Sequence, residues 1–406
     1  MKKIKIALLK EEKIPADNRV ALIPSQCKWV HKNFPHVQVV VQRSAGRCFS
    51  DAEYQRSGIE VVDNIEGCDV MLGIKEVPVH CLIEDKTYLF FSHTKKAQPH
   101  NQTLFRAIID KRTTLIDYEC LEHEDGQRII GFGFFAGIVG AHNGMMAYGN
   151  RTGAFELARV FRHKTFRKLL HTYFELAIPN CKIAVTGSGR VAQGILEVMN
   201  LMQIREMEKE EFLEREFSYP VYVHLKGSDL YENVKDGSYS RADFHASPAN
   251  YRSRFLSYAF GADVLMNGVY WDKAVPRLFE KEDVHHPQFR LQVIADITDD
   301  VNGSVPINMG GGTVTNPVYG VDKITGEKTK PHLPGSVDLM AVDNLPNELP
   351  RDASRYFGEQ LVKYVLPQLL GGESQIIKKA TMVERGRLTE NFLYLQEYAG
   401  GAQSNS

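Results

Sequence analysis

Short apolar runs alternate with amphipathic stretches along the N-terminal third of the chain. Residues 4–9 form an apolar run, residues 25–33 an amphipathic stretch, and further apolar runs follow at residues 37–41, 61–62, 70–74, 88–91 and 114–118. Strands that alternate with helices in this way build parallel sheets whose faces are covered by helices. The pattern therefore predicts an α/β fold.

The same rhythm resumes in the second half of the chain. Glycines recur at 131, 133, 137 and 140, a helix-rich stretch follows at residues 151–176, and a new strand begins at residue 182. Glycines three or four residues apart on a helix let two elements approach closely. We expect a second parallel-sheet domain from this point, and for 406 residues the usual domain size predicts two or three domains.

Composition excludes several classes of protein. The chain has 49 Lys plus Arg against 50 Asp plus Glu, a formal net charge of -1, so it lacks the basic field typical of nucleic-acid or anionic-lipid binding. We expect small-molecule partners, no nucleic acid and no membrane, with a monomer and a homo-oligomer both open. The apolar run at residues 129–141 is shorter than the roughly 20 residues that span a bilayer, and we expect it to be buried.

The six cysteines contain no C-x-x-C pair, which argues against a zinc site and against a disulfide framework. The N-terminal apolar run is too short and too interrupted by lysine to be a signal peptide. We therefore expect a cytoplasmic protein without a bound metal. The Asp299-Asp300 pair lacks a second group of residues with ligand spacing. The tail at residues 401–406 is expected to be disordered.

A glycine-rich turn is the first chemical motif. The strand at residues 182–186 leads into Gly187-Ser188-Gly189-Arg190-Val191-Ala192, and an apolar-periodic helix follows. The order strand, G-x-G-x-x-A, helix is typical of a dinucleotide site, because glycines permit the tight turn and the close approach of backbone to a pyrophosphate. We expect this turn to bind NAD or NADP.

The sequence leaves the choice between the two cofactors open. Glu206 and Glu208 lie near the spacing at which an acidic residue binds the adenosine ribose of NAD, and they favour NAD slightly. Both are part of a charged stretch that suits a solvated surface equally well, and Arg205 suits a 2′-phosphate. Two later strands end in polar or small residues, Asn267 and Gly268 on one and Asp296 on the other, which is the usual place for ligand contact. Because a buried aspartate is costly without a partner, we expect Asp296 to bind a specific group.

Polar residues also follow three apolar runs in the N-terminal half. Arg19 follows the first run, Lys75 and Glu76 follow residues 70–74, and His93 opens a polar stretch after residues 88–91. Parallel strands bring their carboxyl ends to one edge of a sheet, so these side chains are expected to converge there and to face a nicotinamide across a cleft between domains.

A lysine and a histidine beside a nicotinamide suit oxidation of a carbon that bears an amine. Hydride leaves the carbon, an imine forms, water adds, and the carbinolamine collapses to a carbonyl and a free amine. These steps need one proton acceptor for nitrogen and another group that exchanges protons with water. A lysine that is crowded by other cations or desolvated in a cleft can have its pKa lowered toward neutrality, where histidine already titrates. Arginines recognise substrate carboxylates.

Seven motifs together resemble the saccharopine dehydrogenase and lysine–2-oxoglutarate reductase family, whose relatives include alanine dehydrogenase. They lie at residues 92–98, 115–119, 132–137, 186–189, 267–271, 296–298 and 342–346, so the likeness spans nearly the whole chain. The resemblance implies two Rossmann-like domains: a catalytic domain at residues 1–135 completed by residues 343–400, and a dinucleotide-binding domain at residues 136–342. It also implies interconversion of saccharopine with lysine and 2-oxoglutarate.

The resemblance implies a role for individual residues as well. Lys75 and His93 match the catalytic lysine and histidine of the family, and Asp296 matches an aspartate on the cofactor side. Positions near the substrate match Arg19, Glu76, Lys96, Gln98, Glu119, Arg128, Phe135 and Asp343. Residues 212–257 are longer than in the compact fungal enzymes, which cleave saccharopine with NAD, and residues 92–98 are closer to the reductase half of the bifunctional enzymes, which form it with NADPH. Direction and cofactor are therefore open.

Two other functions remain open from sequence. An alanine dehydrogenase-like oxidative deaminase would use the same lysine and histidine on a smaller substrate. A regulatory nucleotide-binding protein that has lost turnover would not need Lys75 and His93 together.

Overall fold

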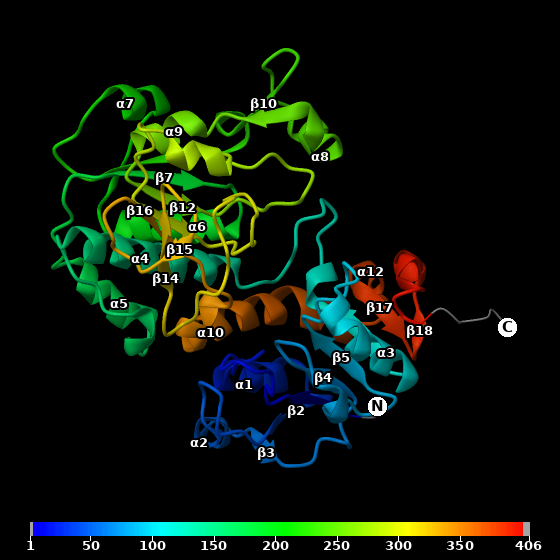
Figure 1. Ribbon diagram of the computed structural model, residues 1–406. Helices are drawn as coiled ribbons and strands as arrows, with labels where there is room; N and C mark the ends of the chain where they lie inside the picture. Colours follow the sequence, from blue (N-terminus) through cyan, green and yellow to red (C-terminus); the bar gives the residue numbers. More distant parts are fainter. Residues whose placement is uncertain (1–2, 401–406) are drawn as a thin grey trace. The chain divides into compact units, whose positions relative to one another are not determined.

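The computed structural model describes residues 3–400, and these divide into two compact units. Of these residues, 3–132 and 350–400 form the first unit, and 133–349 form the second. The chain thus returns to the first unit after completing the second, and Figure 1 shows this return as the orange and red elements that share a unit with the blue and cyan ones. The expected tail at residues 401–406 lies outside the described residues.

The first unit is built on an eight-stranded sheet in the order β18-β17-β6-β5-β4-β1-β2-β3. The strands from β6 to β3 are parallel, whereas β17 and β18 pair antiparallel. The strand bounds are β1 Ile4–Leu8, β2 Val37–Gln42, β3 Glu60–Val62, β4 Val70–Leu72, β5 Thr87–Phe90, β6 Thr114–Asp117, β17 Thr381–Glu384 and β18 Arg387–Leu388. The helices are α1 Pro24–Asn33, α2 Asp51–Arg56, α3 Gln102–Asp110, α10 Pro350–Gln360, α11 Leu366–Leu370 and α12 Gln375–Ala380.

The second unit contains another eight-stranded sheet, in the order β15-β14-β16-β13-β12-β7-β9-β8, and a separate two-stranded ribbon. Its main strands are parallel from β16 to β8. The bounds are β7 Lys182–Thr186, β8 Arg205–Glu206, β9 Val221–Leu225, β12 Val264–Asn267, β13 Val293–Asp296, β14 Val318–Asp322, β15 Lys328–Thr329 and β16 Ser336–Met340, with β10 Tyr231–Asn233 and β11 Tyr251–Ser253 in the ribbon. The helices are α4 Gly133–Thr152, α5 Phe166–Tyr173, α6 Arg190–Leu201, α7 Lys209–Glu214, α8 Arg241–Ala246 and α9 Leu256–Gly261.

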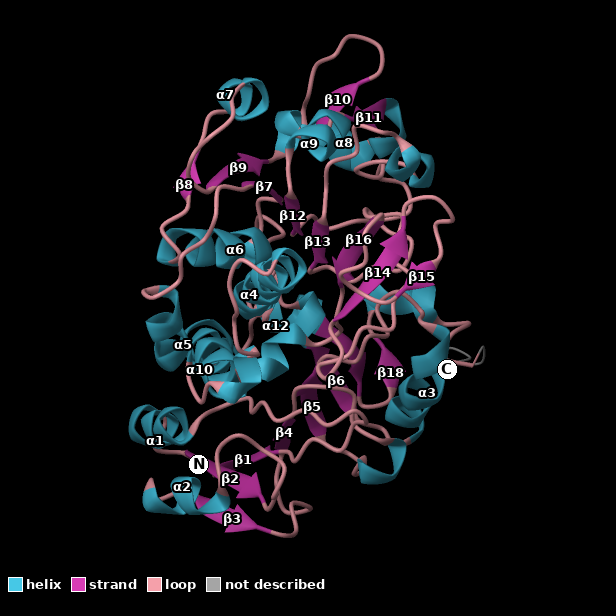
Figure 2. Ribbon diagram, turned by 60° about the vertical axis from the view of Figure 1, so that its left-hand side comes forward, coloured by secondary structure: helices cyan, strands magenta, loops and turns pink. Residues whose placement is uncertain are grey.

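The predicted α/β class is confirmed, because both main sheets are mostly parallel and carry helices against them. Residues 212–257 contribute both to the main sheet and to elements outside it. It contains β9, which is an integral strand of the main sheet, as well as the β10–β11 ribbon and α8. Figure 2 shows the ribbon apart from the main strands of this sheet.

The glycines of α4 allow the close packing that their spacing predicts. A Cβ atom on Gly137 would lie 2.1 Å from the Val191 backbone oxygen, and one on Gly194 would lie 2.0 Å from the Phe134 oxygen. Only glycine therefore permits α4 and α6 to lie this close (Figure 2). The apolar run at residues 129–141 is accordingly packed in the interior, and among the described residues no helix has the length and apolarity needed to cross a bilayer.

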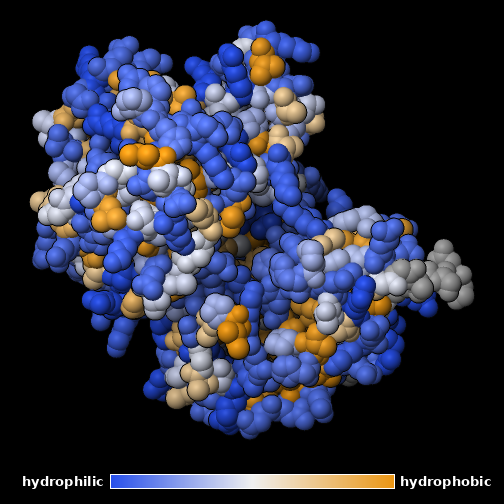
Figure 3. All heavy atoms as spheres, in the orientation of Figure 1, coloured by the Kyte–Doolittle hydropathy of each residue, from blue (hydrophilic) through white to orange (hydrophobic). Residues whose placement is uncertain are grey.

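On the face drawn in Figure 3, hydrophilic residues predominate and hydrophobic residues form small separate groups. Scattered apolar residues of this kind are normal on a folded surface and indicate no large apolar docking site on that face.

Candidate active site

The edge of the first sheet gathers polar side chains from four neighbouring strands. Strands β6, β5, β4 and β1 are adjacent and parallel, so their carboxyl ends lie on the same edge. The segments that follow β1, β4 and β5 carry Glu11, Lys75 with Glu76, and His93 respectively, and Asp117 ends β6. The convergence of strand ends predicted from the sequence is present within this unit.

Glu76 and His93 form the central pair of this edge. The Nδ1 atom of His93 lies 2.7 Å from Glu76 Oε1, while Lys13 Nζ donates to Glu76 Oε2 at 2.7 Å. Burial alone would raise the pKa of Glu76, but the hydrogen bonds from His93 and Lys13 outweigh it and hold that pKa well below its ordinary range. Glu76 is therefore a carboxylate that can only accept hydrogen bonds.

Glu11 fixes the backbone that carries Lys75. Its two carboxyl oxygens accept from the backbone N–H groups of Ile74 at 2.7 Å and of Lys75 at 2.9 Å. Desolvation of its carboxyl group raises the pKa of Glu11 to about 7, in spite of these hydrogen bonds. The start of the Lys75–Glu76 segment is thus anchored to the segment that follows β1.

A second buried carboxyl group anchors the segment that carries His93. Asp117 Oδ2 accepts from both the backbone N–H and the hydroxyl of Ser92, and Asn101 Nδ2 donates to the backbone oxygens of Ser92 at 3.1 Å and His93 at 3.3 Å. Burial raises the pKa of Asp117 to about 6. The backbone of His93 has φ of 49°, a conformation uncommon for residues other than glycine, and these bonds hold it there.

Arg19 is committed to partners inside the first unit. It is 3% exposed, its Nε donates to Asp17 Oδ1 at 2.9 Å, and its guanidinium lies 4.0 Å from the centroid of the Phe132 ring. The structure thus places Arg19 in a buried ion pair, and its role in binding a substrate carboxylate stays a prediction.

The other substrate positions in the first unit differ in exposure. Arg128 is about half exposed and donates to Glu119 Oε1 at 3.2 Å, while Glu119 is anchored through its backbone N–H to Asp117. Lys96 is exposed, and its backbone N–H donates to Gln98 Oε1 at 3.2 Å. Arg128 and Lys96 therefore leave cationic groups accessible to an anionic ligand.

Two expected substrate residues belong to the second unit. Phe135 is buried in α4, with its ring centroid 5.6 Å from that of Phe134, and Asp343 is exposed after β16. The other expected substrate positions belong to the first unit.

The glycine-rich turn has the geometry of a dinucleotide cradle. Gly187 directly follows β7 and has φ of 108°. A Cβ there would lie 2.5 Å from the Gly268 backbone oxygen, so glycine is required for the turn itself. Gly189 is the N-cap of α6, and a Cβ at Gly189 would meet no atom within 4 Å. Open space therefore lies over the N-terminus of a twelve-residue helix, where a pyrophosphate is stabilised by the helix dipole and backbone N–H groups. Ser188 is exposed, and Arg190 and Val191 are partly exposed beside it.

Asn267 and Asp296, which the sequence placed on the cofactor side, form a buried hydrogen-bonded pair. Both side chains are 0% exposed, and they bond one another beneath the strand ends. Asn267 Nδ2 donates to Asp296 Oδ1 at 2.8 Å, and Thr186 donates to Asn267 Oδ1 at 2.8 Å. Asn308 and Thr298 complete the partners of Asp296. The specific partner expected for Asp296 is thus the protein itself, and these two side chains brace the carboxyl ends of β7, β12 and β13.

Glu206 lies away from the turn that it was expected to serve. It is in β8, the edge strand, and β9 separates β8 from β7. Its carboxylate accepts from Tyr222 at 3.1 Å. The strand beside β7 ends instead at Leu225, and the exposed Lys226 follows. Lys226 therefore follows the carboxyl end of the strand next to β7, whereas Glu206 lies one strand farther away.

Sequence reasoning missed Glu11, Lys13, Asp117 and Asn101. Lys13 and Glu11 belong to the run Lys10-Glu11-Glu12-Lys13, which has the composition of a solvated surface turn. Asp117 was noted only as part of a family motif. No periodicity distinguishes these residues, because their partners are 8 or more positions away in the chain and meet them only in the folded sheet.

Residues 7–139 match the family model described as the N-terminal domain of alanine dehydrogenase/PNT. Alpha-aminoadipic semialdehyde synthase of Mus musculus is 29% identical over 448 residues, which cover 97% of this chain and 47% of the mouse protein. The saccharopine dehydrogenase of Emericella nidulans, named as NAD(+)-dependent and L-lysine-forming, is 25% identical over 88% of this chain and 90% of its own length. The chain spans about half the length of the mouse relative.

Among solved structures, an L-alanine dehydrogenase superimposes with a TM-score of 0.66 at 18% identity, covering 97% of this chain and 99% of that one. A transhydrogenase from Sinorhizobium meliloti superimposes with a TM-score of 0.58 at 15% identity, covering 95% of this chain and 98% of that one. The resemblance that the sequence motifs indicate is confirmed by the curated relatives, and the shared fold by these structures.

Proposed function

We propose that the chain is an NAD(P)-dependent oxidoreductase that interconverts saccharopine with L-lysine and 2-oxoglutarate. The observation that carries the proposal is the Glu76–His93 pair, whose side chains lie 2.7 Å apart. Glu76 directly follows Lys75, and the pair joins the segments after two neighbouring parallel strands. The names of the curated relatives support the choice of substrate.

The tautomer of His93 follows from its partner. Glu76 is ionised, so it accepts the hydrogen bond and Nδ1 of His93 donates it. Nε2 of the neutral ring then carries the lone pair that takes up a proton, and the carboxylate stabilises the imidazolium that results. His93 is thereby suited to exchange protons with water at the substrate carbon.

The reaction balances with the groups present. In the direction of saccharopine formation, the lysine amine adds to the ketone of 2-oxoglutarate and the carbinolamine loses water to give an imine. Protons are taken from the amine and given to the departing hydroxide by Lys75 and His93. A nicotinamide cofactor, when bound, would supply the hydride that reduces the imine, and in the reverse direction would accept the hydride from the amine-bearing carbon of saccharopine. In the reverse direction the same residues add water and release lysine and 2-oxoglutarate.

The second unit supplies the cofactor site in this proposal. The open space above Gly189, the N-terminus of α6 and the required glycine at 187 suit a pyrophosphate. Asn267 and Asp296, both buried, hold the strand ends beneath this site.

We propose that Lys226 contacts the 2′ position of the adenosine ribose. An ammonium group after the strand that adjoins β7 favours a 2′-phosphate, whereas Glu206 lies one strand too far to bind a ribose hydroxyl. The proposal therefore favours NADP over NAD, against the slight preference that the spacing of Glu206 gave.

The experiment that tests the function is a steady-state assay of the purified protein with NADH and with NADPH. We expect turnover with lysine plus 2-oxoglutarate and, in reverse, with saccharopine. Efficient reduction of pyruvate plus ammonia without reaction of lysine would replace the proposal with an alanine dehydrogenase activity. Cofactor binding without turnover of either substrate set would indicate a regulatory protein.

A further inference from the structure

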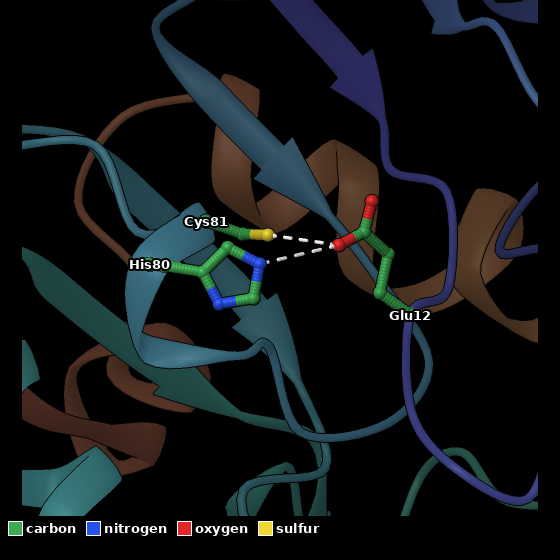
Figure 4. A group of neighbouring side chains, drawn as sticks. All are labelled: Glu12, His80 and Cys81. Carbon is green, nitrogen blue, oxygen red and sulfur yellow. Dashed lines mark hydrogen bonds and ion pairs between the residues drawn. The ribbon is translucent and has the colours of Figure 1, made fainter.

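The side chains of His80 and Cys81 both point toward one carboxylate oxygen of Glu12 (Figure 4). The Cys81 sulfur lies 3.1 Å from Glu12 Oε2, and Nε2 of His80 lies 3.6 Å from the same atom. One donor atom from each residue lies within 4.8 Å of the other two. His80 and Cys81 are in the short 3-10 helix Val79–Cys81 after β4, whereas Glu12 follows β1.

The three donor atoms are of the kinds that zinc prefers. Thiolate sulfur, imidazole nitrogen and carboxylate oxygen bind Zn²⁺ at about 2.0–2.3 Å, which places ligand atoms of a tetrahedral site about 3.4–3.6 Å apart. The observed separations of 3.1 and 3.6 Å bracket that spacing. Within residues 3–400 no other group of three histidine, cysteine or acidic side chains meets the same distance condition.

We propose that Glu12, His80 and Cys81 form a binding site for one Zn²⁺ ion, with water as the fourth ligand. Glu12 would use Oε2, because Lys10 already pairs with Oε1. On binding, the S–H bond of Cys81 breaks and its proton passes to solvent, so the sulfur coordinates as thiolate.

Access to the site is open from solvent. The His80 side chain is 79% exposed, so its ring can turn by the few tenths of an ångström that coordination requires, and Glu12 is partly exposed. Glu12 and Cys81 line the same pocket as Lys75 and Glu76. A bound ion would therefore join the segment before Lys13 to the segment after Glu76, and we expect it to raise Tm.

Cobalt substitution tests the thiolate ligand directly. The protein is freed of metal with a chelator and titrated with Co²⁺ while the near-ultraviolet sulfur-to-cobalt charge-transfer band is recorded. We expect a band that saturates at one equivalent, disappears in Cys81→Ser and persists in the control Cys48→Ser, which alters the other partly exposed cysteine. No band in the unaltered protein, or an equal band in Cys81→Ser, would overturn the proposal.

A second measurement removes the histidine ligand. Competition with a chromophoric chelator gives the Zn²⁺ affinity of the unaltered protein and of His80→Ala, whose side chain is too exposed for its loss to disturb folding. We expect at least a tenfold weaker affinity in His80→Ala and no change in the control His245→Ala, which alters an exposed histidine of α8. Equal affinity in all three proteins would show that zinc binds elsewhere. Neither measurement depends on the enzymatic activity.

Discussion

The Nδ1 atom of His93 lies 2.7 Å from Oε1 of Glu76, and this contact joins the segments that follow two adjacent parallel strands, β4 and β5. Glu76 also accepts a hydrogen bond from Lys13, so the position of its carboxylate does not depend on His93 alone. The pair therefore fixes the orientation of the imidazole at the edge of the first sheet.

Lys75→Met and His93→Gln are each expected to lower kcat by roughly 100-fold or more, the usual scale for loss of a general acid or base. Steady-state assays at saturating substrate measure the effect. Lys28→Met and His245→Gln are exposed controls that should leave kcat unchanged. Near-normal kcat in both site variants would contradict the catalytic assignment.

Glu76→Gln is expected to lower kcat by about 10-fold or more, because an amide neither stabilises the imidazolium nor fixes the tautomer of His93. Steady-state kinetics distinguish this from loss of substrate binding, since kcat should fall in Glu76→Gln while KM changes little. Glu84→Gln removes an exposed carboxylate that pairs with Arg112 and serves as the control. An unchanged kcat would remove Glu76 from the mechanism.

Gly189→Val is expected to abolish dinucleotide binding while the far-ultraviolet circular dichroism stays unchanged. The physical reason is that a Cβ at residue 189 meets no protein atom within 4 Å, so the new side chain fits the fold and occupies only the space for the pyrophosphate. Fluorescence titration with NADH and NADPH measures binding. Full affinity in this variant would move the cofactor site to another part of the chain.

The Lys226 assignment predicts that NADPH binds more tightly than NADH and that Lys226→Glu weakens NADPH binding by about 10-fold or more, with little effect on NADH. Glu206→Gln is the matched control on β8, where neither affinity should change. A loss of NADH affinity in Glu206→Gln would restore the role that the sequence spacing had given to Glu206.

Arg128→Ala and Arg19→Ala are each expected to lower kcat/KM for lysine plus 2-oxoglutarate by at least about 10-fold, because the substrates are rich in carboxylates. Only Arg19→Ala should also lose stability, by about 3–5 kcal/mol, since it leaves the buried Asp17 without its partner. Thermal unfolding separates the two effects. Pyruvate is expected to be a far poorer substrate than 2-oxoglutarate, and the reverse order would contradict the assignment.

The strand-end positions of the site could be predicted from the sequence, whereas the partners of these residues could not. Lys75, Glu76 and His93 follow apolar runs, so their place at strand ends could be read from local periodicity. Their partners Glu11, Lys13 and Asn101 could not, because side-chain pairing between distant segments leaves no periodic pattern. Asp296 was correctly expected to have a specific partner, but that partner is Asn267 on the neighbouring strand rather than the cofactor.

The sequence by itself determined the α/β class, the glycine-dependent turn at residues 187–189 and the helix contact of Gly137. Each depends on periodicity or on a backbone geometry that a single residue type permits. Only the tertiary structure decided that β9 rather than β8 lies beside β7, that Asn267 and Asp296 are buried, and that Glu12 meets His80 and Cys81. These relationships depend on the order in which distant strands pair, and that order is set by the packing of the whole sheet rather than by any local pattern.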